Sequence, residues 1–175
     1  MNKITFSSDI KRPALNEYKK CTKMAETYFK MSEDKSQINS TISDKIWAHK
    51  YNPDTLNLIK DKTKLIGFTW TVPCNKELMN KFLRKKISEK KLLKEIQQKG
   101  INQKNFETLY LCASLIILKY RGFGLGRKAR IKTINKLIKI RKIKPILFSW
   151  PFTKADYKLK LNTARITKLK LLIRE

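Results

Sequence analysis

Hydrophobic and polar residues alternate along the chain with two different periods. Short apolar runs typical of strands occupy 4–6, 56–59, 64–72, 108–120, 145–150 and 169–173. Between them, apolar residues recur every three or four positions, which predicts helices over 13–31, 75–98, 129–141 and 156–161 and a short helix around Ile46. The polar segment 32–43 predicts a loop or a frayed helix. Strands separated by helices in this way are typical of an α/β fold.

The long apolar run at 108–120 predicts a central strand that is covered on both faces. The runs at 56–59 and 64–72 predict a hairpin, which Pro73 ends because proline cannot continue a strand ladder. A charged helical stretch then separates this hairpin from the central strand. We therefore expect a helical insertion at about 75–106 within a single domain that spans 1–175.

A glycine cluster, Gly122, Gly124 and Gly126, lies between the predicted central strand and the next helix. Glycine allows a positive φ and a close approach of the backbone to a ligand. The N–H groups at a helix start, together with the helix dipole, attract anions. The basic residues nearest to the cluster are Arg121, Arg127, Lys128 and Arg130. No acidic residue occurs in 108–155, so the segment predicts a binding site for a pyrophosphate.

Two common phosphate-binding motifs do not fit this cluster. A P-loop requires a Lys followed by Ser or Thr after its last glycine, and Arg127 and Lys128 occupy those places. A dinucleotide-binding loop requires GxGxxG with an acidic residue about 20 positions later, whereas the chain has GxGxG and no such acid.

Composition excludes several classes of protein. The chain has 175 residues, of which 41% are hydrophobic and 10% aromatic, so it is too apolar for a disordered polycation. No apolar run is long enough to span a membrane, and the first residues lack the apolar stretch of a signal peptide. Three cysteines without a CxxC pair predict neither a disulfide scaffold nor a metal site. We expect a cytoplasmic protein without a membrane partner and without a metal.

The charge leaves several interpretations open. Lys and Arg number 41 against 14 Asp and Glu, which gives a formal net charge of +27. Such a charge suits nucleic acid, a polyphosphate cofactor, or a merely compositional preference for Lys. The basic helix 125–141 contains no aromatic residue to stack on bases, which disfavours a nucleic-acid-binding module without excluding it.

The pattern Arg-x-x-Gly-x-Gly, formed by Arg121, Gly124 and Gly126, resembles the acetyl-CoA pyrophosphate loop of the GCN5-related N-acetyltransferase (GNAT) superfamily. The preceding run 111–120 is similar to the fourth strand of that family, and the hairpin at 56–72 to its second and third strands. The resemblance covers about 55–160. It implies an α/β fold with a mixed, mostly antiparallel central sheet flanked by helices.

The resemblance further implies an acetyl-CoA-dependent N-acetyltransferase that acts by direct attack of a primary amine on the thioester. The acceptor is a small molecule, a peptide or a protein, and the chain is a monomer or a homodimer. A catalytically inactive acyl-CoA-binding protein remains the alternative. The amide of Ile116 is expected near the thioester carbonyl. The residues expected to bind the cofactor are Ser114, Leu115, Ile116, Arg121, Gly122, Phe123, Gly124, Leu125, Gly126, Arg127 and Asn162.

The expected catalytic residues depart from the family pattern. The family often has an Asn followed by a Tyr that acts as the acid, whereas this chain has Tyr157 before Asn162. Glu107 lies near the position of the catalytic Glu of histone-type members, one residue further upstream. We expect Glu107 and Tyr157 to be catalytic, without assigning the base and the acid. In this fold the insertion borders the acceptor cleft, so its acids Glu77, Glu89 and Glu95 are expected to attract a cationic amine. His49 is expected to be a loop residue, and Cys112 a buried apolar side chain.

Overall fold

The computed structural model describes residues 3–29 and 41–175. The predicted loop at 32–43 and the end of the first predicted helix therefore lie largely outside the described residues. In chain order, the elements are β1 (Ile4–Phe6), α1 (Ser7–Ile10), α2 (Leu15–Phe29), α3 (Ile42–Tyr51), β2 (Leu56–Asp61), β3 (Lys64–Cys74), α4 (Lys76–Leu83), α5 (Glu89–Gln98), β4 (Thr108–Ile116), a 3-10 turn (Leu118–Tyr120), α6 (Leu125–Arg141), β5 (Ile146–Ser149), α7 (Lys154–Thr167) and β6 (Leu171–Ile173).

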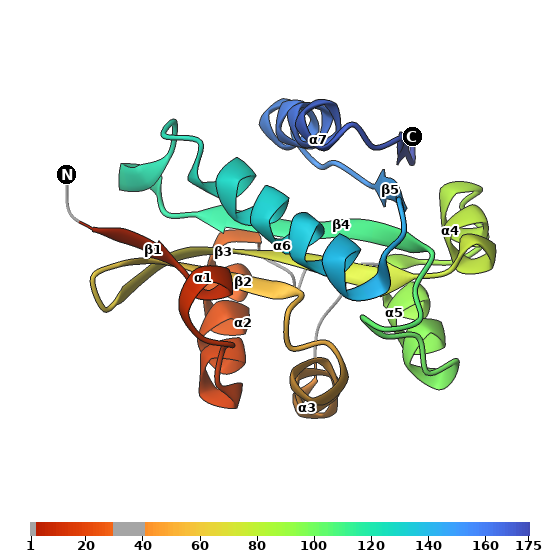
Figure 1. Ribbon diagram of the computed structural model, residues 1–175, viewed down its shortest axis with the longest axis horizontal. Coiled ribbons are helices and arrows are strands. Elements are labelled where there is room, and N and C mark those ends of the chain that lie inside the picture. The colour runs from red at the N-terminus through yellow and green to blue at the C-terminus, as the bar shows by residue number, and fades with distance from the viewer. Residues whose placement is uncertain (1–2, 30–40) are drawn as a thin grey trace.

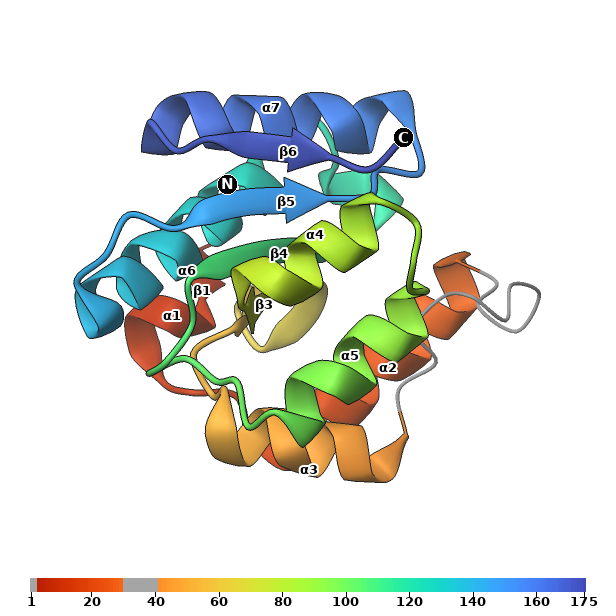
Figure 2. The same ribbon diagram turned by 90° about the vertical axis from the view of Figure 1, so that its right-hand side faces the viewer.

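The six strands form one sheet in the order β1-β2-β3-β4-β5-β6. The pairs from β1 to β4 are antiparallel, and β5 is parallel to both β4 and β6. Helices α6 and α7 lie on one side of the sheet, and α2, α3 and α5 on the other, as Figures 1 and 2 show. The predicted α/β class with a mixed, mostly antiparallel sheet is thus confirmed.

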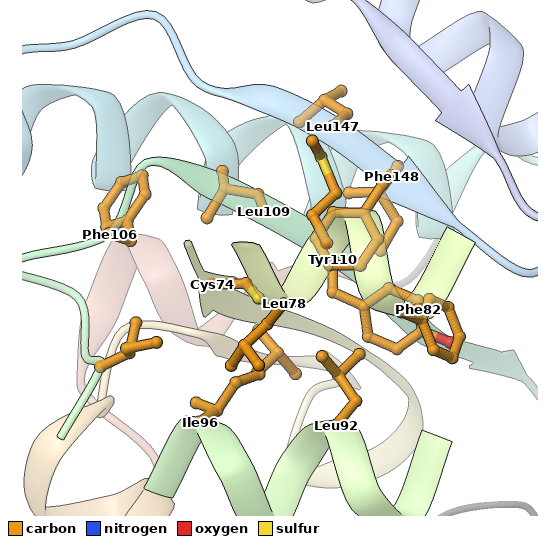
Figure 3. Packing of buried hydrophobic residues seen from close by; sticks show 14 of the residues in the cluster. Cys74, Leu78, Phe82, Leu92, Ile96, Phe106, Leu109, Tyr110, Leu147 and Phe148 are labelled. Atoms are coloured by element: carbon orange, nitrogen blue, oxygen red, sulfur yellow. The ribbon is translucent and has the colours of Figure 1, made fainter. Parts of the chain in front are cut away.

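The helical insertion forms part of the hydrophobic core. Leu78 and Phe82 of α4 and Leu92 and Ile96 of α5 are buried against β3, β4 and β5 (Figure 3). Both helices begin at side chains that cap their first turns: Asn75 accepts a hydrogen bond from the Leu78 amide, and Ser88 from the Lys91 amide. Because apolar faces are buried on both helices, the insertion has a fixed place beside the sheet.

Several element boundaries differ from the prediction, and α1 was not predicted. Strand β4 ends at Ile116, because residues 118–120 turn into the glycine cluster as a 3-10 turn. Strand β3 continues past Pro73, which pairs with Leu109. Proline is accommodated there because β2 reaches only Trp70, so β3 has no β2 partner at Pro73. Helix α7 spans Lys154–Thr167 and is longer than the predicted 156–161.

Candidate active site

Strand β4 has an open edge in the middle of the sheet. Strand β5 pairs only with Thr108–Tyr110, and no β5 partner is described for β4 beyond that point. On the other side, Trp70 of β3 pairs with Ala113 but Thr71 pairs with Leu111, so Cys112 is an extra residue. Such a bulge bends the strand and changes the direction of its side chains. The bulge lies where β4 separates from β5.

The register between β3 and β4 determines in which direction the backbone N–H and C=O groups of β4 point. The amide of Ile117 donates to the Ile66 carbonyl of β3. Hydrogen-bonded and non-hydrogen-bonded pairs alternate in antiparallel strands, so the backbone groups of Ser114 and Ile116 point away from β3 and toward the open edge. The Nε of Arg121 donates to the Ile116 carbonyl at 2.8 Å, in agreement with that direction. The edge therefore offers backbone groups to an extended ligand.

The glycine cluster joins this edge to the start of α6. Gly122 has a φ of 87° and Gly124 a φ of 69°, and Gly124 is the N-cap of α6. A Cβ on Gly126 would lie 2.9 Å from the Ser114 Oγ, so only glycine lets the helix start pack this closely on β4. The first amides of α6 and the positive end of its dipole therefore meet the open edge.

One cavity of about 1240 Å³ connects the glycine cluster, the open edge of β4 and the first residue of α5. Every residue predicted to bind the cofactor lines this cavity: Ser114, Leu115, Ile116, Arg121, Gly122, Phe123, Gly124, Leu125, Gly126, Arg127 and Asn162. The structure therefore brings together residues from β4, the glycine cluster and α7. The amide of Ile116 lies at the glycine-cluster end, whereas the bulge lies near Ser114.

The two predicted catalytic residues do not line the cavity. Glu107 precedes β4, and its carboxylate accepts a hydrogen bond from the Lys76 amide at the start of α4. It lies at the end of β4 opposite to the glycine cluster. Tyr157 is exposed on α7, one position after Asp156, which lines the cavity. Tyr157 is absent from the lining although its neighbours Asp156 and Lys158 both contribute to it.

Of the insertion acids Glu77, Glu89 and Glu95, which were expected near the acceptor cleft, Glu89 is buried and lines the cavity. It is the first residue of α5 and was not among the residues expected to be catalytic. The Tyr110 hydroxyl donates to Glu89 Oε1 at 2.5 Å, and the Cys112 Sγ lies 3.8 Å from the same oxygen. A glutamate in the first turn of a helix is ordinarily a surface residue, whose negative charge interacts favourably with the positive end of the helix dipole. The sequence alone therefore did not indicate which of the three insertion acids points inward.

Cys112 is the bulge residue and faces Glu89. Burial, and then the negative charge of Glu89, raise the pKa of its thiol well above the usual value. The group is therefore a neutral thiol, which disfavours a nucleophilic role. The expectation of a loop position for His49 is wrong, because it lies on α3. It contacts the Tyr18 ring edge-on and does not line the cavity.

Arg130 was predicted to supply positive charge to the anion site, but its side chain lies elsewhere. It is fully buried, and its Nη2 donates to the Ala113 carbonyl at 2.7 Å, beside the bulge. Its side chain thus turns inward, four residues after Gly126, and ties α6 to β4. Burial lowers the pKa of Arg130, and likewise that of Lys160, whose Nζ lies 2.7 Å from the Asp156 carboxylate.

Within the described residues, no group of three or more His, Cys, Asp or Glu side chains is placed to hold a metal ion. No helix in the described ranges has the length and apolarity needed to cross a membrane.

No protein-family model matches the chain, and no curated protein sequence matches it. The structure is similar to that of the diaminobutyrate acetyltransferase EctA from Paenibacillus lautus, which was determined in complex with its substrate L-2,4-diaminobutyric acid and coenzyme A. The two chains are 12% identical, with a TM-score of 0.54 over 95% of this chain and 77% of the other. At this identity the likeness concerns the fold, which is GNAT-like.

Proposed function

We propose that the chain binds acetyl-CoA and transfers its acetyl group to a primary amine. The observation that carries this proposal is the single cavity that joins an anion-binding helix start, an open strand edge and a buried carboxylate. The fold likeness to an acetyltransferase bound to coenzyme A supports the same function. In that relative the amine is a small molecule, and we propose a small-molecule acceptor here as well.

The cofactor follows the cavity from the glycine cluster to the bulge. The amides from Gly122 to Arg127 bind the pyrophosphate, and the guanidinium groups of Arg121 and Arg127 add charge-assisted contacts. The pantetheine arm pairs with the outward backbone groups of Ile116 and Ser114, as an added strand would. Asn162 of α7 lies across the same cavity and offers an amide to the arm.

This path places the thioester near the bulge, beside Ser114 and Cys112. The Ser114 amide, rather than that of Ile116, then donates to the oxygen that becomes negative in the tetrahedral intermediate. Glu89 accepts a proton from the acceptor's ammonium, and the neutral amine attacks the thioester carbon. The C–S bond breaks as the amide forms, and the second amine proton ends on the CoA thiolate. Glu107 and Tyr157 do not line the cavity, so in this proposal Glu89, and not Glu107, is the base.

Calorimetric titration with acetyl-CoA tests the proposed binding, and two glycines provide a matched pair of variants. Gly122 and Gly100 both have a positive φ with open space around the missing Cβ, but only Gly122 lines the cavity. Alanine costs each site about 1–2 kcal/mol of backbone strain. We expect Gly122→Ala to weaken acetyl-CoA binding at least tenfold and Gly100→Ala to leave it unchanged.

The proposal fails if the native chain shows no saturable binding of acetyl-CoA. Binding without release of free CoA across a panel of amines would instead identify a protein that binds acyl-CoA without transfer. An equal loss of affinity in both glycine variants would show that general destabilisation, not the anion site, controls binding.

A further inference from the structure

The cavity has a second branch, away from the open edge, between the sheet and the helices α2 and α3. We call it the α2–α3 chamber. Besides the half-buried Asp44 and Lys45 at the start of α3, six residues with exposed fractions of 8% or less line it. They are Tyr18, Cys21, Ala25, Ala48, Leu56 and Phe68.

Small side chains keep the chamber open. Cys21 and Ala25 stand one turn apart on α2, and Ala48 faces the same space from α3. Opposite them lie the larger side chains Leu56 and Phe68 of the sheet. Leucine at either alanine would occupy this space, so the chamber depends on residue size at those positions.

The chamber leads to the proposed reaction centre. Trp70 and Ala113, which pair at the bulge, also line the cavity and pack against the cluster that forms the chamber. Glu89 lies on the other side of the bulge residue Cys112. Helix α5, which carries Glu89, contacts α3 through a hydrogen bond from Gln97 Nε2 to Asp44 Oδ1 at 2.7 Å.

The six buried wall residues carry no charge, and the carboxylate of Asp44 already accepts hydrogen bonds from Thr41 and Gln97. Burial and the nearby Glu17 raise the pKa of the Cys21 thiol to about 12, and burial raises that of the Tyr18 hydroxyl, so both are neutral at physiological pH. A charged group on a ligand would lose its hydration there without gaining a partner of opposite charge. An apolar group would be stabilised in proportion to the area that it buries.

We propose that the acceptor is a primary amine with an apolar body, which occupies the α2–α3 chamber while its ammonium group meets Glu89. This inference rests on the proposed transferase function and specifies its acceptor. A single buried carboxylate at the reaction centre and a chamber with uncharged buried walls suit an alkylamine or an arylalkylamine. They do not suit a polyamine or an amino acid, whose additional charges would enter the chamber.

The test measures CoA release with acetyl-CoA and the linear amines from propylamine to hexylamine, beside spermidine and L-2,4-diaminobutyric acid. Each buried methylene should raise kcat/KM about fourfold. Spermidine and diaminobutyric acid should react more slowly than hexylamine. A flat alkylamine series, or a preference for either charged amine, would overturn the inference while leaving the transferase function intact.

A pair of leucine variants tests whether the dependence of kcat/KM on amine length arises in the α2–α3 chamber. Ala48→Leu fills the chamber and should flatten the alkylamine series, whereas Ala14→Leu adds the same side chain at an exposed position before α2. Ala25→Leu repeats the test if Ala48→Leu folds poorly, and the dissociation constant of acetyl-CoA shows that each variant retains its cofactor site. The same enzymes are assayed with acyl-CoA donors from acetyl to hexanoyl. The chamber would bind the acyl group instead if kcat/KM increased with the length of the acyl donor and this increase were lost in Ala48→Leu. That result would overturn the acceptor proposal.

Discussion

At the glycine-cluster end of the cavity, the ligand-facing groups belong to one continuous segment, 114–127, and most of them are backbone amides. At the other end, around Glu89, the lining side chains come from α2, α3, α5, β4 and α7. The first end is suited to a ligand of fixed chemistry, such as a pyrophosphate. The second can change its specificity by substitution of single side chains on separate elements.

This difference predicts where each kind of variant acts. Changes at the end around Glu89 should alter turnover and acceptor choice, whereas changes at the glycine-cluster end should alter cofactor affinity. The first and the last of the following predictions test that separation, and the one between them tests the stability of the fold that holds both ends.

The largest effect is expected for Glu89→Gln, which removes the proposed base but keeps the shape of the side chain. General base catalysis contributes about 10²- to 10⁴-fold, so kcat should fall by that amount while acetyl-CoA binds with its native affinity. Glu107→Gln is the matched control, since Glu107 does not line the cavity. If Glu107→Gln abolishes turnover and Glu89→Gln does not, the assignment of the base is reversed.

A second prediction concerns Asp54, which joins three segments that lie far apart in the sequence. Its buried carboxylate accepts hydrogen bonds from Arg12 near the N-terminus and Gln103 after the insertion, and pairs with Lys136 of α6 at 2.7 Å. Asp54→Asn should lower the free energy of unfolding by about 1–3 kcal/mol at neutral pH. Denaturant unfolding measures this loss.

The pH dependence of that loss follows from the pKa of Asp54. Burial alone would raise it, but hydrogen bonds from Lys136, Arg12 and Gln103 together lower it. The stabilisation is therefore complete above the unfolded value of about 3.9 and disappears as the pH falls through the lower folded pKa. The native chain and Asp54→Asn should converge in stability at acid pH; a constant difference down to the lowest pH would show that the carboxylate charge contributes nothing.

The smallest effect is expected for Arg121→Ala at the glycine-cluster end. Arg121 is exposed and stays beside the pyrophosphate site through its bond to the Ile116 carbonyl. Loss of one solvent-screened charge contact should weaken acetyl-CoA binding about fivefold, or about 1 kcal/mol, with unchanged kcat. Lys119→Ala, which removes a charge outside the cavity, is the control. A reduced kcat with unchanged affinity would contradict the separation of the two ends.

The glycine-cluster end was predictable because its signals are local. Three glycines between an apolar strand and a helix specify a turn with positive φ, and the helix start supplies amides wherever the rest of the chain lies. The resemblance added the path along β4, and every residue predicted on that path lines the cavity. The place of the bulge at Cys112 was not predictable, because it depends on the register between β3 and β4.

The sequence by itself thus determined most of the elements, the α/β class and the glycine turn at the start of α6, since these follow from hydrophobic period and from the backbone freedom of glycine. Only the tertiary structure decided that Glu89 enters the cavity, that Arg130 turns inward to the bulge, and that Ala25 and Ala48 leave a chamber. The physical reason is the range of the interactions. Helix packing fixes the direction of these side chains through contacts between residues far apart in the sequence, and the local pattern carries no record of them.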